Sequence, residues 1–227
     1  MLDLYAWPTP NAHKVSIMLE EIGLPYNVFP IDIRSGQQSA PEFLKVSPNG
    51  KMPAIVDDDA PGGPVSIFES GAILMYLAEK SGQFWPMEVH ARYDAAQWVM
   101  WQMAGFGPMT GQAFHFSHYA PEKMPYAINR YVTEVKRLIA VLDRRLEDRD
   151  WIAKEYSIAD MACYSWSLVP EYLGIAIHDY PAVQRWQTRM GDRPAVQRGM
   201  ALLAEFSQAP EELDDKAREA LFGKQTD

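Results

Sequence analysis

The chain has 227 residues, enough for one compact unit or two closely packed domains. Apolar residues make up 48% of it and aromatic residues 12%, which excludes a largely disordered protein. The formal net charge is −9 and no segment concentrates lysine and arginine, so a nucleic-acid partner is not expected. Because no apolar run is long enough to cross a bilayer and no basic leader precedes one, we expect a cytoplasmic protein without a membrane partner.

Residues 1–82 alternate strand-like and helix-like segments at short intervals, a pattern typical of an α/β domain. Gly23 supplies a C-terminal stop for the first helix, and the turn-forming residues of 57–64 indicate a hairpin loop. The expected strands are 2–5, 26–31, 54–56 and 65–68, and the expected helices are 12–22, 41–46 and 71–80.

Residues 88–208 show helical periodicity alone, so we expect an all-helical second domain after a linker at 82–88. A long apolar stripe runs from 128 to 146, and residues 89–119 form a helix that glycines and Pro108 should kink or split. Ser157 and Asp160 form a capping box before another apolar helix, and one or two shorter helices follow within 181–204. Residues 209–227 are expected to be an acidic, loosely held tail.

Several common motifs fail on inspection. The glycines at 105, 107 and 111 have the wrong spacing for a dinucleotide loop, and Gly50-Lys51 lacks the other residues of a phosphate loop. His115 and His118 share a helix face without a nearby carboxylate or thiol, so no metal is expected. The single cysteine, Cys163, excludes an internal disulfide, and we expect it to be buried and inert.

One arrangement in the first 70 residues indicates an anion site. Thr9 and Asn11 lie in the turn before the first helix, where free N–H groups and the helix dipole favour negative charge. Pro53 comes just before a strand, a position that suits a cis peptide bond. Glu69 and Ser70 lie between a strand and a helix. Taken singly, these residues also suit ordinary roles, with Asn11 and Ser70 as helix caps and Thr9 as a turn residue.

Together with the element order, these residues resemble the glutathione transferase family. The resemblance implies a thioredoxin-like α/β N-terminal domain at 1–82, which binds glutathione, and an all-α C-terminal helical bundle domain at 88–208, which lines the second-substrate site and the dimer interface. The stretches that carry it are Thr-Pro-Asn (9–11), Ser-Pro-Asn-Gly-Lys-Met-Pro-Ala-Ile-Val (47–56), Ile-Phe-Glu-Ser-Gly-Ala-Ile-Leu-Met-Tyr-Leu-Ala-Glu-Lys (67–80) and Tyr-Ser-Ile-Ala-Asp (156–160). More narrowly, Thr-Pro-Asn and the run at 101–112 with His115-Phe116 resemble the bacterial nu class, which includes glutathione-dependent disulfide reductases.

The resemblance implies that Thr9 and Asn11 donate hydrogen bonds to the glutathione sulfur. Donors and the positive end of a helix favour the thiolate, which is the nucleophile, over the thiol. Two other residues could activate the thiol instead. Tyr5 lies on the first strand, where a packing role is the competing interpretation, and His13 lies on the first helical turn, where we expect a solvated side chain.

The same resemblance assigns the other parts of glutathione. The backbone of Met52, exposed by a cis Pro53, would pair with the cysteinyl unit, and Gln38 and Lys51 would hold the glycine carboxylate. For the γ-glutamyl unit, the matching residues are Glu69 for the amine and Ser70 for the carboxylate.

Residues of the helical domain match the rest of the site. Arg130 resembles an arginine that reaches the glutathione site from the partner subunit of a homodimer, and a polar-face arginine is the alternative. The residues expected on the second-substrate side, with packing as the alternative, are Gln102, Gln112, His115 and Phe116.

The resemblance predicts an enzyme that reduces disulfides with glutathione as co-substrate and with no metal or catalytic cysteine of its own. Conjugation of glutathione to small electrophiles and reduction of organic peroxides are the alternative activities. A non-catalytic binding protein of the same fold is a further alternative, because a fold alone does not establish activity.

Overall fold

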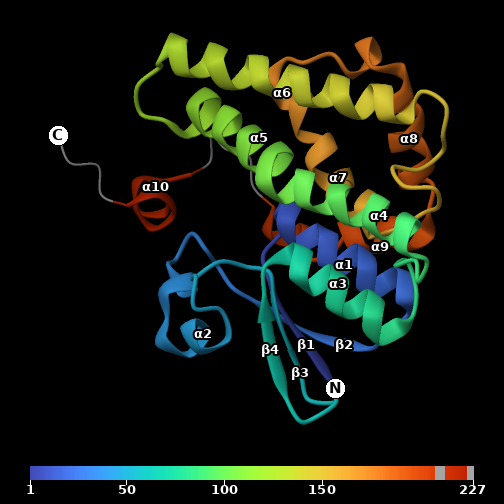
Figure 1. Ribbon diagram of the computed structural model, residues 1–227. Helices are drawn as coiled ribbons and strands as arrows, with labels where there is room; N and C mark the ends of the chain where they lie inside the picture. The colour runs from blue at the N-terminus through green and yellow to red at the C-terminus, as the bar shows by residue number, and fades with distance from the viewer. Residues whose placement is uncertain (208–212, 224–227) are drawn as a thin grey trace.

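The computed structural model describes residues 1–207 and 213–223. Its N-terminal half contains a four-stranded sheet in the order β2-β1-β3-β4 (Figure 1). β1 and β2 are parallel, whereas β3 runs antiparallel to both β1 and β4. The strands are β1 (Leu2–Ala6), β2 (Tyr26–Pro30), β3 (Ala54–Asp57) and β4 (Val65–Phe68). All four predicted strands are therefore confirmed, with ends that differ by one residue at most.

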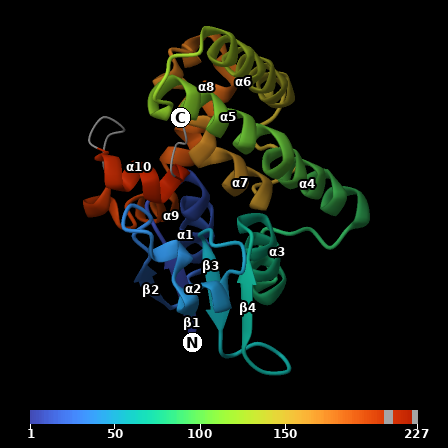
Figure 2. The same cartoon turned by 90° about the vertical axis from the view of Figure 1, so that its left-hand side faces the viewer.

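Three helices complete the thioredoxin-like half: α1 (Pro10–Ile22), α2 (Pro41–Val46) and α3 (Ser70–Ser81). α1 ends at Gly23, whose φ of +64° is the left-handed conformation expected of a glycine stop. α1 and α3 lie between the sheet and the helical half, and α2 packs against β3 and β4 (Figures 1 and 2).

The helix predicted over 89–119 is interrupted, as its glycines and Pro108 indicated. It consists of α4 (Val89–Trp101), a π-helical segment (Gln102–Phe106), α5 (Gly107–Phe114) and a second π-helical segment (His115–Tyr119). At Gly107 a Cβ atom would lie 2.6 Å from the Gln102 Nε2 atom, so glycine permits the close approach there. Each π turn shifts which side of the helix the following residues face.

The remaining predicted helices are also present: α6 (Pro125–Leu146), α7 (Ile158–Ser167), α8 (Pro181–Gly191) and α9 (Pro194–Met200). α6 buries the C-terminal part of its predicted apolar stripe, from Val135 to Leu146. The capping box is confirmed at the start of α7, where Asp160 accepts from the Ser157 backbone N–H at 3.0 Å.

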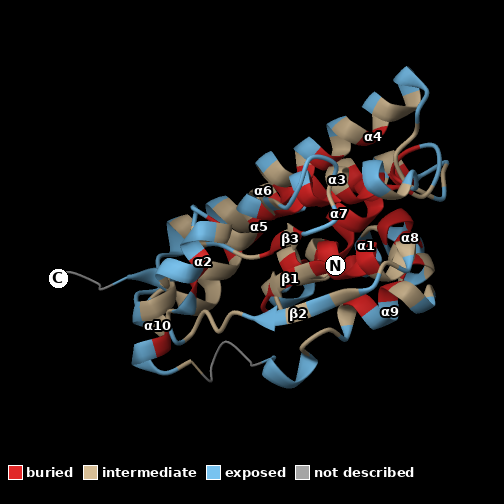
Figure 3. Ribbon diagram, turned by 90° about the horizontal axis from the view of Figure 1, so that it is seen from below, coloured by how far each residue is buried: buried red, intermediate tan, exposed pale blue. Residues whose placement is uncertain are grey.

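The two halves share one core, centred on α1 (Figure 3). α1 packs against α3 on one side and against α7 and α9 of the helical half on the other. At Gly199 a Cβ atom would lie 2.6 Å from the Ile17 backbone, and the Ser16 hydroxyl donates to the Gly199 carbonyl at 2.7 Å. Because α9 meets α1 at backbone contact distance, the position of α1 is fixed from both halves.

Part of the predicted tail is a helix, α10 (Asp215–Phe222). The Asp214 side chain caps its start, and the Phe222 ring lies 4.8 Å from His115 and 5.1 Å from Tyr119, centroid to centroid. The expectation of a loosely held tail also covers residues 209–212 and 224–227, which lie outside the described residues. Within the described ranges, no helix has the length and apolar character needed to span a bilayer.

Candidate functional site

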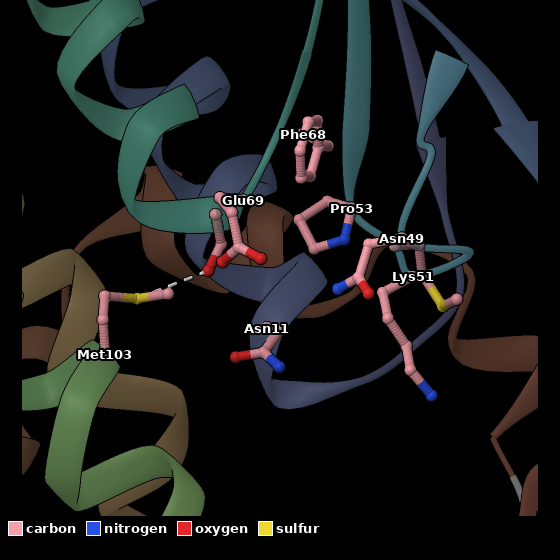
Figure 4. A pocket seen from close by; sticks show the side chains of 9 residues that line it. Asn11, Asn49, Lys51, Pro53, Phe68, Glu69 and Met103 are labelled. Atoms are coloured by element: carbon pink, nitrogen blue, oxygen red, sulfur yellow. Dashed lines mark hydrogen bonds between the residues drawn. The ribbon is translucent and has the colours of Figure 1, made fainter. Parts of the chain in front are cut away.

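Three loop-to-element junctions meet at the boundary between the two halves: the start of α1, the turn before β3 and the start of α3. They enclose two cavities that adjoin, since Asn11, Lys51 and Met52 line both. The smaller cavity, about 170 Å³, is also lined by Pro53, Glu69, Ser70 and Met103, among others (Figure 4). The larger, about 750 Å³, falls within the size range of small-molecule sites and opens toward α5, α7 and α10. The three sequence motifs of the first 70 residues therefore form one site.

The start of α1 presents polar donors to these cavities. Thr9, not Asn11, is the N-cap: its Oγ1 atom accepts from the Ala12 N–H at 3.4 Å, which leaves the hydroxyl proton free to donate elsewhere. Pro10, at the first helical position, has no N–H, and among the described residues the Asn11 N–H has no acceptor. The helix start thus offers a hydroxyl, an amide and an unpaired N–H at the positive end of the dipole.

A residue of the other half fixes the orientation of the Asn11 amide. The Trp166 indole N–H donates to Asn11 Oδ1 at 2.8 Å. An indole nitrogen can only donate, so the atom facing it must be the amide oxygen, and the amide NH₂ is left as a donor. Trp166 and Asn11 both line the larger cavity. No local pattern in the sequence points to this tryptophan, because it lies 155 residues from its partner in the chain.

Replacing this indole should misplace the Asn11 donor. The family resemblance implies that Asn11 donates to the sulfur of bound glutathione in a disulfide reductase. On that expectation, Trp166→Phe should raise the thiol pKa of the bound glutathione and lower kcat for disulfide reduction about tenfold, the effect of losing one oriented hydrogen bond. Ultraviolet titration of the bound thiol together with steady-state kinetics measures both. Trp151→Phe, a change outside the residues that line the two cavities, is the matched control. A lower kcat with an unchanged thiol pKa would contradict the positioning role.

The turn before β3 has the predicted cis peptide bond, between Met52 and Pro53. The Ser47 hydroxyl donates to the Lys51 carbonyl at 2.8 Å and holds the turn. Pro53 is buried, whereas the Lys51 side chain is exposed and extends along the cavity wall (Figure 4). The backbone at Met52 therefore borders the cavity at the point where the sheet begins.

At the start of α3, an acidic side chain and a hydroxyl border the smaller cavity. Glu69 has φ +71° and ψ 112°, a conformation that residues with a side chain rarely adopt and that carries strain. Its exposed carboxylate points toward the space beside Pro53 and Asn49 (Figure 4), and Lys51 lines the same cavity. Ser70 is buried at the N-terminus of α3. The smaller cavity thus combines one negative and one positive group with a helix N-terminus.

Gln38 lines the larger cavity but is held by the C-terminal helix. It is buried in a short 3₁₀ turn (Gln37–Ser39), and its Nε2 atom donates to the Ala220 carbonyl of α10 at 3.0 Å. Leu221 of the same helix also lines this cavity. The residue predicted to hold the glycine carboxylate is therefore hydrogen-bonded to α10.

Removing this bond should loosen α10. We expect Gln38→Ala to raise the rate of trypsin cleavage at Lys216 and Arg218 about fivefold, because one hydrogen bond contributes about 1 kcal/mol to holding the helix. Mass spectrometry of short digests measures the rate. Gln197→Ala, whose amide bonds only to the Gly191 carbonyl, is the control. Equal rates in the two variants would show that the contact does not hold α10.

The residues expected on the second-substrate side do not line either cavity. Gln102 is fully buried, Gln112 is exposed, His115 packs against Phe222, and Phe116 stacks on Tyr131 at 5.5 Å. The same helical stretch instead contributes Gly111, Phe114, His118 and Tyr119 to the larger cavity, together with Trp166 and Tyr172. Gly111, Phe114 and His118 are three and four residues apart, a helical spacing that could have identified this face of the helix. The π segments on either side of α5, however, change which face of the helix points toward the cavity.

The alternative thiol-activating residues lie elsewhere. Tyr5 stacks on Phe29, at a centroid separation of 5.1 Å. Contrary to the expectation of a solvated side chain, the Nε2 atom of His13 is buried and has no hydrogen-bond partner in the described part of the chain, and burial lowers the pKa of His13 to about 4. Cys163 is fully buried, as expected, and burial raises the pKa of its thiol. None of the three lines either cavity.

Arg130 lies near the start of α6, with its side chain 58% exposed and a guanidinium nitrogen 4.0 Å from the Glu134 carboxylate. It lines neither cavity of its own chain.

Comparison with known proteins places the chain in a family. Residues 1–79 match the glutathione S-transferase N-terminal domain, and residues 106–194 match its C-terminal domain. The chain is 51% identical to the disulfide-bond oxidoreductase YfcG of Escherichia coli over 206 residues, covering 89% of this chain and 95% of that one. It is 43% identical to E. coli YghU, another disulfide-bond oxidoreductase, covering 87% and 73%.

Solved structures of glutathione transferases have the same fold as this chain. A glutathione transferase of Burkholderia graminis, with two glutathione molecules bound per subunit, has a TM-score of 0.85 at 47% identity and covers 88% of this chain and 87% of that one. A glutathione transferase of Pseudomonas putida, with one glutathione disulfide bound per subunit, has a TM-score of 0.85 at 46% identity and covers 88% and 90%. With both family domains matched in order and the predicted fold present, this chain belongs to the glutathione S-transferase family.

Proposed function

We propose that this protein is a glutathione-dependent disulfide-bond reductase of the nu class, whose nucleophile is a glutathione thiolate stabilised by Thr9 and Asn11. The observation that carries the proposal is the start of α1: a free hydroxyl proton, an oriented amide NH₂ and an unpaired N–H meet at a cavity. The chain's one cysteine is buried outside that cavity, so the reacting sulfur must come from the co-substrate. Relatives named disulfide-bond oxidoreductases support the reaction type.

The reaction needs two glutathione molecules for each disulfide. The first thiolate attacks one sulfur of the disulfide, forms a mixed disulfide with glutathione and releases the other half as a thiolate. The second glutathione attacks the glutathione sulfur of the mixed disulfide, which gives glutathione disulfide and releases the second thiolate. Each released thiolate takes up a proton lost by a glutathione thiol. The larger cavity and the related structures with two glutathiones, or with glutathione disulfide, support this stoichiometry.

The other parts of glutathione follow the charges of the site. The carboxylate of Glu69 suits the γ-glutamyl amine, and Ser70 with the α3 N-terminus suits the γ-glutamyl carboxylate. The Met52 backbone beside cis Pro53 suits the cysteinyl unit, and Lys51 suits the glycine carboxylate. Gln38 would bind the same carboxylate as Lys51 once its amide donates to the ligand in place of the Ala220 carbonyl.

We further propose that the protein acts as a cytoplasmic homodimer and that Arg130 completes the site of the partner subunit. Its side chain is largely exposed and lines neither cavity of its own chain, which suits a role across an interface. Arg130→Ala should then weaken glutathione binding without changing unfolding, because among the described residues its largely exposed side chain pairs with Glu134 only at 4.0 Å.

The test is turnover of 2-hydroxyethyl disulfide against turnover of 1-chloro-2,4-dinitrobenzene, each with reduced glutathione. We expect faster disulfide reduction. Faster conjugation would instead support the alternative of a transferase acting on small electrophiles, and faster turnover of cumene hydroperoxide would support a peroxidase. Retention on immobilised glutathione without turnover of any of the three would indicate a binding protein. A crystal soaked with oxidised glutathione should hold two linked tripeptides.

A further inference from the structure

Lys14 is a buried cation that the mechanism above does not use. It lies on α1, its side chain is 1% exposed, and it is among the largest fully buried side chains. Its Nζ atom donates to Gln102 Oε1 at 2.5 Å, to Ser70 Oγ at 3.4 Å and to Met103 Sδ at 3.5 Å. All three partners are uncharged.

The ammonium has no counter-ion in the described residues. No carboxylate of these residues lies within ion-pair distance of it. The titratable groups that act on it are the Glu69 carboxylate, which precedes α3, and the Cys163 thiol on α7. The π segment after α4 contributes the uncharged Gln102 and Met103. Burial lowers the pKa of Lys14 to about 7. A buried ammonium is unfavourable unless an anion compensates it, whereas lysines without such a partner usually extend to solvent. Burial disfavours the charged form of this amine, and an anion bound nearby would favour it, so a carboxylate in the adjacent cavity and the Lys14 ammonium would stabilise each other.

Ser70 lies between Lys14 and the smaller cavity, because it accepts a hydrogen bond from Lys14 and also lines the cavity. Because Ser70 Oγ accepts from Lys14, its own proton must point to another acceptor, and it now faces Met103 Sδ at 3.7 Å. Ser70 and Met103 line the cavity beside Glu69, but Lys14 does not (Figure 4). A bound carboxylate that replaced the weak sulfur acceptor would accept from a hydroxyl polarised by the cation behind it.

We propose that Lys14 is a positioning residue for the α-carboxylate of a γ-glutamyl peptide: it holds the Ser70 hydroxyl as a donor and supplies the buried positive charge that this carboxylate neutralises. The inference rests on the proposed function. Together with Glu69, which faces the amine, it makes the smaller cavity specific for a free amino-acid end, with both charged groups recognised separately.

The experiment uses isothermal titration calorimetry with S-methylglutathione, so that thiol ionisation does not contribute, and with two S-methyl analogues. In one, 4-aminobutanoyl replaces the γ-glutamyl unit and removes only the α-carboxylate. In the other, glutaryl replaces it and removes only the amine. We expect Lys14→Met to bind S-methylglutathione and the glutaryl analogue about tenfold more weakly than the unmodified protein does. Its affinity for the 4-aminobutanoyl analogue should be unchanged.

Controls separate this role from a structural one. Lys14→Gln keeps a donor for Gln102 but removes the charge, so it should show the same ligand-dependent loss and serves where the methionine variant does not fold. Lys154→Met removes the same charge from an exposed position and should change none of the affinities. Equal weakening of all three ligands, or no weakening, would overturn the inference while leaving the proposed function intact. Failure of the unmodified protein to bind S-methylglutathione would overturn both.

Discussion

The double variant Thr9→Ala, Asn11→Ala should lose about 10²- to 10³-fold in kcat/KM for 2-hydroxyethyl disulfide, the cost of removing donors aimed at a reacting anion. The thiolate would then retain only the helix dipole and the free N–H groups of α1, so the thiol pKa of bound glutathione should rise toward about 8.5. Affinity should change only a few-fold, because Glu69, Ser70 and Met52 remain. Kinetics, calorimetry and the ultraviolet absorbance of the thiolate measure the three quantities.

A matched surface change controls for this variant. Asn27→Ala, Thr188→Ala removes the same two residue types from exposed positions on β2 and α8 and should keep full activity. The pH dependence of activity should change in the same way as the thiol pKa. The unmodified protein should keep its activity down to the lowered pKa of the bound thiol, whereas the double variant should gain activity only as the pH rises toward the pKa of the free thiol. A double variant with unchanged turnover and an ionised thiol would show that other groups hold the sulfur.

Asp160→Ala should lower the free energy of unfolding by about 3–5 kcal/mol, because it leaves several buried donors unpaired at about 1–3 kcal/mol each. The carboxylate is fully buried. Its Oδ1 atom accepts from the Ile152 N–H and the Trp186 indole, each at 2.9 Å, and its Oδ2 atom accepts from the Ser157 N–H at 3.0 Å. Alanine leaves these three buried N–H donors unpaired and also removes the acceptor of the Ser157 hydroxyl, which costs more than the hydrogen bonds themselves contribute.

Asp160→Asn tests the same network with the shape preserved. Both carboxylate oxygens accept from N–H donors, so either amide orientation brings an NH₂ group against a donor, and we expect a loss above 1 kcal/mol. Urea unfolding monitored by circular dichroism measures both variants. Asp150→Ala, which breaks an exposed pair with Arg189, should lose less than about 1 kcal/mol. A loss for Asp160→Ala as small as this control would contradict the role of the network.

The elements and much of the site could be predicted because their signals are local. The glycine stop at Gly23, the pairing of Ser157 with Asp160 and the apolar stripe of α6 each depend on residues within a few turns, so the sequence specifies them. Pro53 precedes its strand directly, and its cis bond is confirmed. The prediction that the three junctions form one site came from the family resemblance. The residues taken singly could equally have served as helix caps and turn residues.

The sequence by itself therefore determined the order of the strands and of the helices up to α9, and the polar residues at the three junctions, because caps, turns and periodicity act between neighbours in the chain. Only the tertiary structure decided the N-cap at Thr9, the orientation of Asn11 by Trp166 and the burial of Lys14 against Gln102. It also decided which residues of 102–119 face the cavity, since π turns alter the helical period. These features depend on contacts between residues far apart in sequence, and no local pattern encodes which distant side chain fills a given space.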